Sequence, residues 1–129
     1  MVSSFVRQTV LIMENDQPTL WLYMRTMEQE YQVLGAANKD EAMALLENHS
    51  VSVVVLEPGP VITQGWALLA ELKQTPKYAS IPVIICTTQD ERRRGIELGS
   101  AVYLTKPVLP ALLLKTVRKL IRTELTNGG

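Results

Sequence analysis

The chain has 129 residues, a length typical of one domain that can bury its own apolar core. Thirteen basic residues balance thirteen acidic ones, so the net charge favours neither nucleic acid nor an anionic membrane as a partner. The single cysteine, Cys86, excludes an intramolecular disulfide, and its apolar neighbours favour a buried side chain over a reactive thiol. No apolar run is long enough for a signal peptide or a membrane span, so we expect a cytoplasmic protein.

Short apolar runs alternate with amphipathic segments along the whole chain. Continuous apolar runs are typical of strands buried on both faces, and apolar residues three or four positions apart are typical of helices. In chain order the sequence predicts a strand at 10–13, a helix from Pro18, a strand at 32–36, a helix after Asn38, a strand at 51–56, a helix after Gly65, a strand at 81–86, a weak helix at 89–98, a strand at 101–104 and a long helix at 110–125.

Individual residues support several of these boundaries. Asn38 with Glu41 three residues later resembles a capping box at a helix start. Pro76 stops the third helix, because proline cannot continue the backbone hydrogen bonding. Trp21 and Trp66 are expected to pack their helices against the rest of the protein, and residues 126–129 are expected to be a tail or the start of a linker.

Strict alternation of strands and helices predicts an α/β fold with a doubly wound parallel sheet covered on both faces. In such folds the functional crevice lies at the carboxyl ends of the strands. The polar residues that follow the predicted strands within a few positions are Glu14, Asn15, Asp16, Glu57, Thr87, Thr88, Thr105 and Lys106. Carboxylates are ligands that Mg²⁺ prefers, whereas a lysine and a hydroxyl suit the oxygens of a phosphoryl group.

Three segments, at 10–16, 75–84 and 99–107, are similar in order and spacing to those of response-regulator receiver domains. The resemblance covers nearly all of the chain. It implies a single receiver domain over 1–129, with a core at about 8–125 and a five-stranded flavodoxin-like sheet in the order 2-1-3-4-5. It also implies a role in two-component phosphorelay signalling rather than as an enzyme. The expected partner is a histidine kinase, an output domain or another receiver.

The resemblance also assigns a role to each residue at the rim. Glu57 stands at the position of the phosphoacceptor, where the family has aspartate, and Thr87 and Lys106 stand where the family binds the phosphoryl oxygens. Glu14 with Asn15 stands at the pair of acids that hold Mg²⁺ together with the acceptor; Asp16 replaces Asn15 if the register differs by one residue. Tyr103 stands where an aromatic side chain reports the state by changing rotamer, and the Lys106–Pro107 bond is expected to be cis.

Four features depart from the family pattern. Glu57 carries one methylene more than aspartate, which would displace an acyl phosphate from Thr87 and Lys106. Asn15 removes one anionic ligand for Mg²⁺. The loop that follows Glu57 is Pro-Gly-Pro, at 58–60, and the fourth helix is shorter than the family norm, so we expect it to be short or frayed.

These departures favour a pseudo-receiver that is not phosphorylated, needs no cofactor and binds Mg²⁺ weakly at most. The Glu57 carboxylate is expected to reach Lys106 as an ion pair, which either remains from a lost site or holds an on-like state. The alternative is a Mg²⁺-dependent receiver that is phosphorylated on Glu57. Tyr103 is either a packed aromatic or a working switch, and the 89–125 face, with its basic last helix, is either solvated or a partner or homodimer surface.

An enzyme or a nucleotide-binding protein is disfavoured by the motifs. No glycine-rich phosphate loop follows the first strand, where the turn is acidic. The only histidine, His49, falls between the second helix and third strand, on the rim opposite the crevice, so it cannot activate a nucleophile there. The balanced charge disfavours nucleic-acid binding by this domain.

Overall fold

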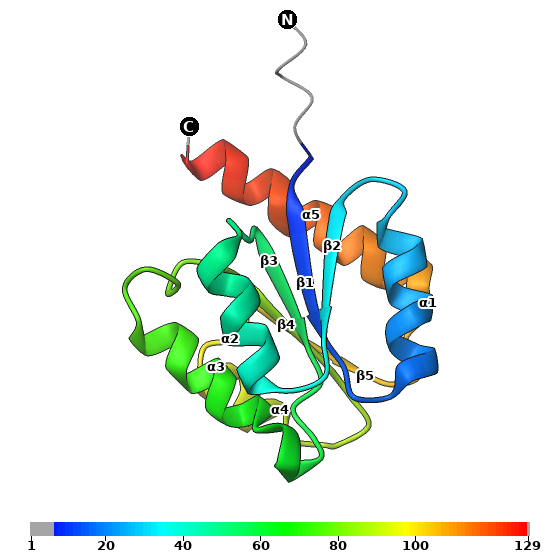
Figure 1. Ribbon diagram of the computed structural model, residues 1–129, viewed down its shortest axis with the longest axis vertical. Coiled ribbons are helices and arrows are strands. Elements are labelled where there is room, and N and C mark those ends of the chain that lie inside the picture. The colour runs from blue at the N-terminus through cyan, green and yellow to red at the C-terminus, as the bar shows by residue number, and fades with distance from the viewer. Residues whose placement is uncertain (1–6, 129) are drawn as a thin grey trace, which may run out of the picture.

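A computed structural model describes residues 7–128 of the protein, with a five-stranded parallel sheet in the order β2-β1-β3-β4-β5 (Figure 1). The strands are β1 (Thr9–Met13), β2 (Gln32–Ala36), β3 (Val53–Leu56), β4 (Val83–Thr87) and β5 (Val102–Thr105). The helices are α1 (Gln17–Met27), α2 (Lys39–Asn48), the 3₁₀ helix η2 (Val61–Thr63), α3 (Gly65–Gln74), α4 (Arg92–Glu97) and α5 (Pro110–Gly128). The predicted doubly wound fold and strand order are confirmed.

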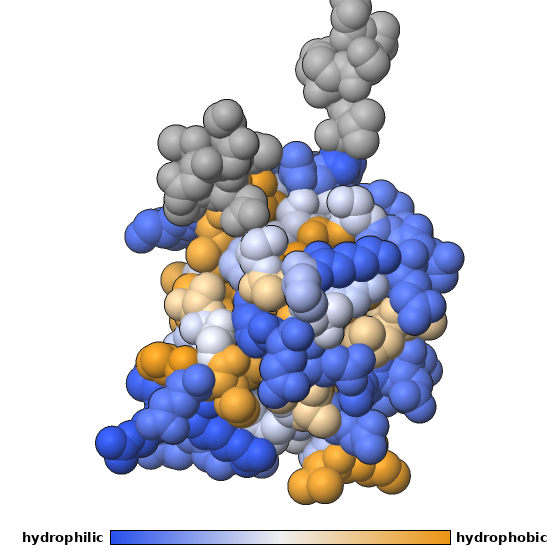
Figure 2. All heavy atoms as spheres, turned by 90° about the vertical axis from the view of Figure 1, so that its left-hand side faces the viewer, coloured by the Kyte–Doolittle hydropathy of each residue, from blue (hydrophilic) through white to orange (hydrophobic). Residues whose placement is uncertain are grey.

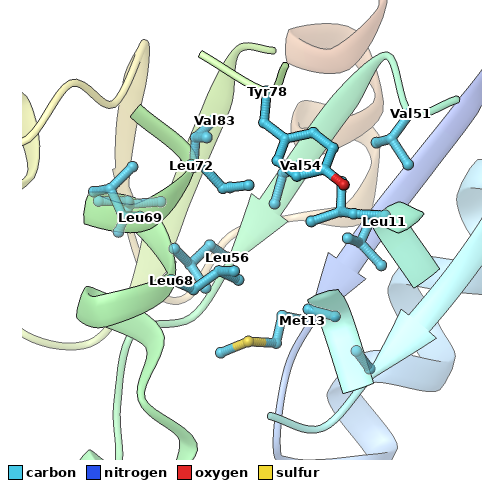
Figure 3. Packing of buried hydrophobic residues seen from close by; sticks show 14 of the residues in the cluster. Leu11, Met13, Val51, Val54, Leu56, Leu68, Leu69, Leu72, Tyr78 and Val83 are labelled. Carbon is cyan, nitrogen blue, oxygen red and sulfur yellow. The ribbon is translucent and has the colours of Figure 1, made fainter. Parts of the chain in front are cut away.

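Two apolar layers, one on each face of the sheet, hold the helices in place. Alternate residues of a strand point to opposite faces, so Leu11 and Met13 pack towards α2 and α3, while Val10 and Ile12 pack towards α1 and α5. Figure 3 shows the first layer, where strand residues meet leucines of α3. Because β1, β3 and β4 are buried along their whole length, the carboxyl ends of these strands are fixed relative to one another.

Side-chain caps fix the starts of two helices. The Asn38 side chain accepts a hydrogen bond from the Glu41 N–H at 2.9 Å, and the Glu41 carboxylate accepts one from the Ala37 N–H at 2.8 Å. The predicted cap is therefore confirmed. Asp16 caps α1 in the same way, since its carboxylate accepts from the Thr19 N–H at 3.1 Å, and Pro18 stands in the first turn.

The structure corrects several sequence-based expectations, and some predicted strand ends shift by one or two residues. The fourth helix begins only at Arg92 and has six residues, so its shortness is confirmed but its predicted start at Gln89 is wrong. The last helix continues to Gly128, and residues 126–128 are therefore helical rather than a tail. Trp21 does not pack its helix, because the buried stripe of α1 is Leu20, Tyr23 and Met27 and leaves Trp21 65% exposed. Within residues 7–128 no helix has both the length and the apolar character needed to cross a bilayer.

The connection between β3 and α3 contains a hydrogen-bonded 3₁₀ turn that the sequence did not predict. The hydroxyl and the N–H of Thr63 both donate to the Pro60 carbonyl, and Thr63 is buried. Gln64 adopts the left-handed conformation with φ of 59°, and Gly65 then packs directly against the Pro58 backbone. The conformation of the turn is therefore stabilised by the hydrogen bonds of Thr63 to Pro60 and by the packing of Gly65 against Pro58.

Gly65→Ala tests whether this close approach is required. A Cβ at position 65 would lie 2.4 Å from the Pro58 Cα, and this backbone atom cannot move aside without shifting the turn. We expect a loss of about 2 kcal/mol or more in the free energy of unfolding, measured by urea denaturation. The matched control is Gly59→Ala, whose Cβ would meet only the flexible Gln89 side chain at 3.1 Å and should cost little. Equal stability of the two variants would contradict the inference.

Candidate functional site

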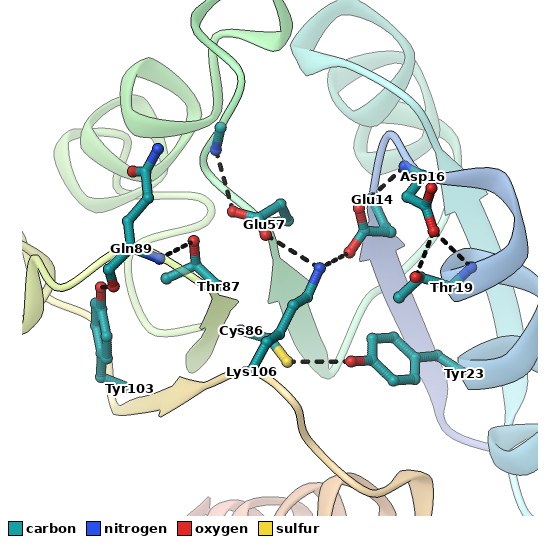
Figure 4. Close-up of polar contacts among 11 residues, drawn as sticks. Glu14, Asp16, Thr19, Tyr23, Glu57, Cys86, Thr87, Gln89, Tyr103 and Lys106 are labelled. Atoms are coloured by element: carbon teal, nitrogen blue, oxygen red, sulfur yellow. Dashed lines mark hydrogen bonds and ion pairs between the residues drawn. The ribbon is translucent and has the colours of Figure 1, made fainter.

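A lysine and two glutamates meet where three strands end. Glu14 directly follows β1, Glu57 directly follows β3, and Lys106 directly follows β5 (Figure 4). The Lys106 Nζ atom lies 2.5 Å from the Glu14 Oε1 atom and 3.0 Å from the Glu57 Oε1 atom. The Glu57–Lys106 ion pair expected from the sequence is present, and Glu14 joins it from the other side.

Both carboxylates also accept a hydrogen bond from the backbone through their second oxygen. The Glu14 Oε2 atom accepts from the Asp16 N–H at 3.0 Å, and the Glu57 Oε2 atom accepts from the Gly59 N–H at 3.2 Å. Each carboxylate thus connects the Lys106 ammonium to the loop that follows its own strand. Lys106 therefore ties together the loops after β1, β3 and β5, and every oxygen of the two carboxylates has a partner within the chain.

The ion pairs are largely shielded from solvent. The exposed fractions of the side chains are 4% for Glu14, 11% for Glu57 and 15% for Lys106. Burial alone would lower the pKa of Lys106, but the hydrogen bonds to Glu14 and Glu57 outweigh it and raise the pKa above its usual value. Lys106 is therefore held in its charged form through the physiological pH range.

Of the residues expected to hold Mg²⁺, Glu14, Asp16 and Glu57 are engaged by other groups of the chain. The Asn15 side chain is exposed, and the Asp16 carboxylate is engaged by Thr19, whose hydrogen bonds also hold the pKa of Asp16 below its usual value. Glu14 and Glu57 both pair with the Lys106 ammonium. In the part of the chain that the structure describes, no group of three or more His, Cys, Asp or Glu side chains is placed to hold a metal ion.

Thr87 and Tyr103 lie on the other side of the rim and form hydrogen bonds with the loop after β4. The buried Thr87 hydroxyl accepts from the Gln89 N–H at 3.2 Å. The Tyr103 hydroxyl donates to the Gln89 carbonyl at 2.5 Å and accepts from the Glu91 N–H at 2.9 Å. Arg92 donates to the Tyr103 carbonyl and lies over its ring. Tyr103 is thus buried and bonded to the segment that leads into α4.

Cys86 lies on β4 beneath this rim, and the expectation of a buried side chain is confirmed. Its thiol is 3.5 Å from the Tyr23 hydroxyl, and burial raises the pKa of both groups. The thiolate is therefore disfavoured, which argues against a reactive cysteine.

Sequence reasoning brought the right residues to the rim but missed two of their contacts. The ion pair between Glu14 and Lys106 was not expected from the sequence. The capping role of Asp16 carried a readable signal, because an aspartate followed two residues later by proline is typical of a helix start. The Lys106–Pro107 bond is cis, as is the Gly59–Pro60 bond.

Comparison with known proteins relates the chain to one family. The family model of the response regulator receiver domain matches residues 10–118. Protein PilH of Pseudomonas aeruginosa is 30% identical over 116 residues, which cover 86% of this chain and 96% of PilH. The phosphate regulon transcriptional regulatory protein PhoB of the same organism is 28% identical over 124 residues, covering 91% of this chain and 53% of PhoB. The chain thus spans about half the length of PhoB.

A solved structure supports the fold independently. The chemotaxis protein CheY4 of Vibrio cholerae superposes with a TM-score of 0.81 at 24% identity, covering 89% of this chain and 99% of CheY4. At this identity the likeness concerns the fold, and it agrees with the observed strand order.

The raised pKa of Lys106 predicts an alkaline loss of stability. Its folded-state pKa lies above the unfolded value of about 10.4, so the contribution of the ammonium is complete below that pH. It is lost as the pH rises through the folded-state pKa. We expect the difference in unfolding free energy between the wild-type protein and Lys106→Gln to be constant near neutral pH and to shrink in this alkaline range, as measured by urea denaturation.

The control is Lys77→Gln, which removes an exposed lysine and accounts for general effects of alkaline pH. A difference for Lys106→Gln that stays constant into the alkaline range would contradict the raised pKa.

Proposed function

This chain belongs to the response regulator receiver family, and we propose that it acts in two-component signalling as a protein-interaction module that does not need phosphorylation. The observation that supports the proposal is the position of the Lys106 ammonium between the Glu14 and Glu57 carboxylates. In a receiver, the lysine at this position is available to an incoming phosphoryl group. Here it is already neutralised by two side chains of the same chain.

The chemistry at position 57 points the same way. A phosphoryl group on Glu57 would take one of the two carboxylate oxygens that now pair with the Lys106 ammonium and with the Gly59 N–H. The acceptor carbon would also lie one bond further out than that of an aspartate, and small positional errors cost large factors in rate. With Asn15 in place of an acid, little anionic charge remains to attract Mg²⁺ and offset that cost.

We infer that the partner is a protein, and that the chain is a signalling module rather than an enzyme. Receiver domains interact with histidine kinases and output domains, and PhoB, named a transcriptional regulatory protein, extends beyond the matched region. The 89–125 face supports a partner or homodimer surface, because Ile96, Leu109 and Leu112 are exposed there. On α5, Lys115 and Lys119 lie beside it and would favour an acidic partner.

Phosphorylation is tested by incubating the protein with acetyl phosphate and Mg²⁺ and measuring the mass of the intact chain by mass spectrometry. We expect no phosphoryl adduct on the wild-type protein, because Lys106 is engaged and the acceptor is displaced. A stoichiometric adduct that disappears in Glu57→Gln would establish the second candidate function, a receiver phosphorylated on Glu57.

The matched control restores the family pattern in the same chain. Glu57→Asp combined with Asn15→Asp shortens the acceptor and returns the missing acid, and we expect it to recover part of the phosphorylation and of the Mg²⁺ affinity. Mg²⁺ binding no tighter than that of the parent would show that Asn15 is not what weakens the metal site.

A further inference from the structure

The turn between β3 and α3 presents two apolar side chains to solvent. Val61 is 91% exposed and Ile62 is 84% exposed, more than any other large apolar side chain among those described. An apolar group projects at the lower edge of the face in Figure 2, at the end of the molecule where Figure 1 places this turn. Leaving two branched aliphatic side chains in water forgoes the free energy that their burial would give.

This exposure is not the result of a loose loop. Gln64 closes the turn through a hydrogen bond from its N–H to the Val61 carbonyl at 3.0 Å, and Thr63 anchors the turn to Pro60. The contact of Gly65 with the Pro58 backbone then joins the turn to α3. Val61 and Ile62 are therefore held in place as a fixed apolar projection, referred to below as the knob.

A groove of about 370 Å³ lies directly beside the knob. Its lining is mainly apolar and includes Pro58, Gly65, Trp66 and Ala67, with Val61 of the knob itself at one edge. The volume exceeds that of two aliphatic side chains. The knob cannot fill the groove of its own chain, because both its side chains remain almost fully exposed.

The lining of the groove also carries one charge of each sign. Arg94 lies over the Trp66 ring at 4.3 Å and pairs with Glu91 at 3.3 Å, and both residues line the groove. A surface with this arrangement is complementary to itself, since a two-fold axis can set the Arg94 of one copy against the Glu91 of the other. The formal net charge of the whole chain is zero, so two copies do not repel one another.

We propose that two copies of this chain associate through this surface, with the knob of each copy seated in the groove of the other. A two-fold contact uses the same patch on both copies, and the adjacent knob and groove supply both halves of it. The groove begins at Pro58, one residue after Glu57, and shares Glu91 and Arg94 with the start of the 89–125 face. The contact does not depend on whether Glu57 accepts phosphate.

The test is sedimentation velocity on the full chain from micromolar to millimolar concentration. We expect a monomer–dimer equilibrium in the wild-type protein. Val61→Ser with Ile62→Ser should weaken it by about a hundredfold or more, because each dimer loses four buried aliphatic side chains. Ala67→Gln, which fills the groove from an exposed helical position, should weaken it as well.

Mixing the two variants distinguishes a reciprocal contact from a general loss of solubility or folding. The Ala67→Gln copy still has a knob and the serine variant still has an open groove, so their mixed dimer should be tighter than either variant with itself. The matched control is Trp21→Ser with Leu22→Ser. These two exposed apolar residues lie on α1, away from the knob, so their removal should leave the dimer unchanged.

A wild-type protein that stays monomeric throughout would overturn the proposal. A dimer that persists when Val61 and Ile62 are both replaced by serine would also overturn it. So would a dimer that is lost in a variant with Leu109→Ser and Leu112→Ser but kept in the Val61→Ser, Ile62→Ser variant.

Discussion

The Lys106 ammonium holds the carboxyl end of the sheet together. Two buried carboxylates at the ends of neighbouring strands would repel each other, and buried charges persist only when they are paired. Lys106 pairs with Glu14 and Glu57 at once, and each carboxylate also accepts a hydrogen bond from a backbone N–H of the loop that follows its own strand. The lysine can reach both because the parallel sheet brings its strand ends to one rim. In this way the fold creates a site whose charges are satisfied within the chain.

This arrangement gives the departures from the family pattern a common physical meaning. The longer side chain of Glu57 places its carboxylate 3.0 Å from the Lys106 ammonium, and Asn15 adds no further negative charge to the rim. Tyr103 binds the loop before α4 through its hydroxyl without any contribution from Glu57 or Lys106. The rim is thus held by ion pairs on one side and by the hydrogen bonds of Tyr103 on the other.

The sequence predicted what depends on periodicity and topology. Apolar strand runs alternating with helices determined the sheet and brought Glu57 and Lys106 to one rim, so their ion pair followed. The Glu14 contact was not predictable, because it depends on the reach of the lysine side chain rather than on spacing. Trp21 was misplaced, because the buried stripe of α1 runs through Leu20, Tyr23 and Met27 and leaves Trp21 outside it. The exposure of Val61 and Ile62 followed no periodic rule, since a 3₁₀ turn of three residues has no amphipathic pattern to read.

Because the Lys106 ammonium pairs with both Glu14 and Glu57, we predict that it competes with Mg²⁺ for these carboxylates. The most direct measurement is an NMR titration of the folded chain with Mg²⁺, following the backbone amides of Glu14, Asp16 and Gly59. For the wild-type protein we predict no saturable shifts at millimolar Mg²⁺, and for Lys106→Gln, whose carboxylates are freed, saturable shifts at these amides. Saturable shifts of the same amides in the wild-type protein at millimolar or lower Mg²⁺ would contradict the claim.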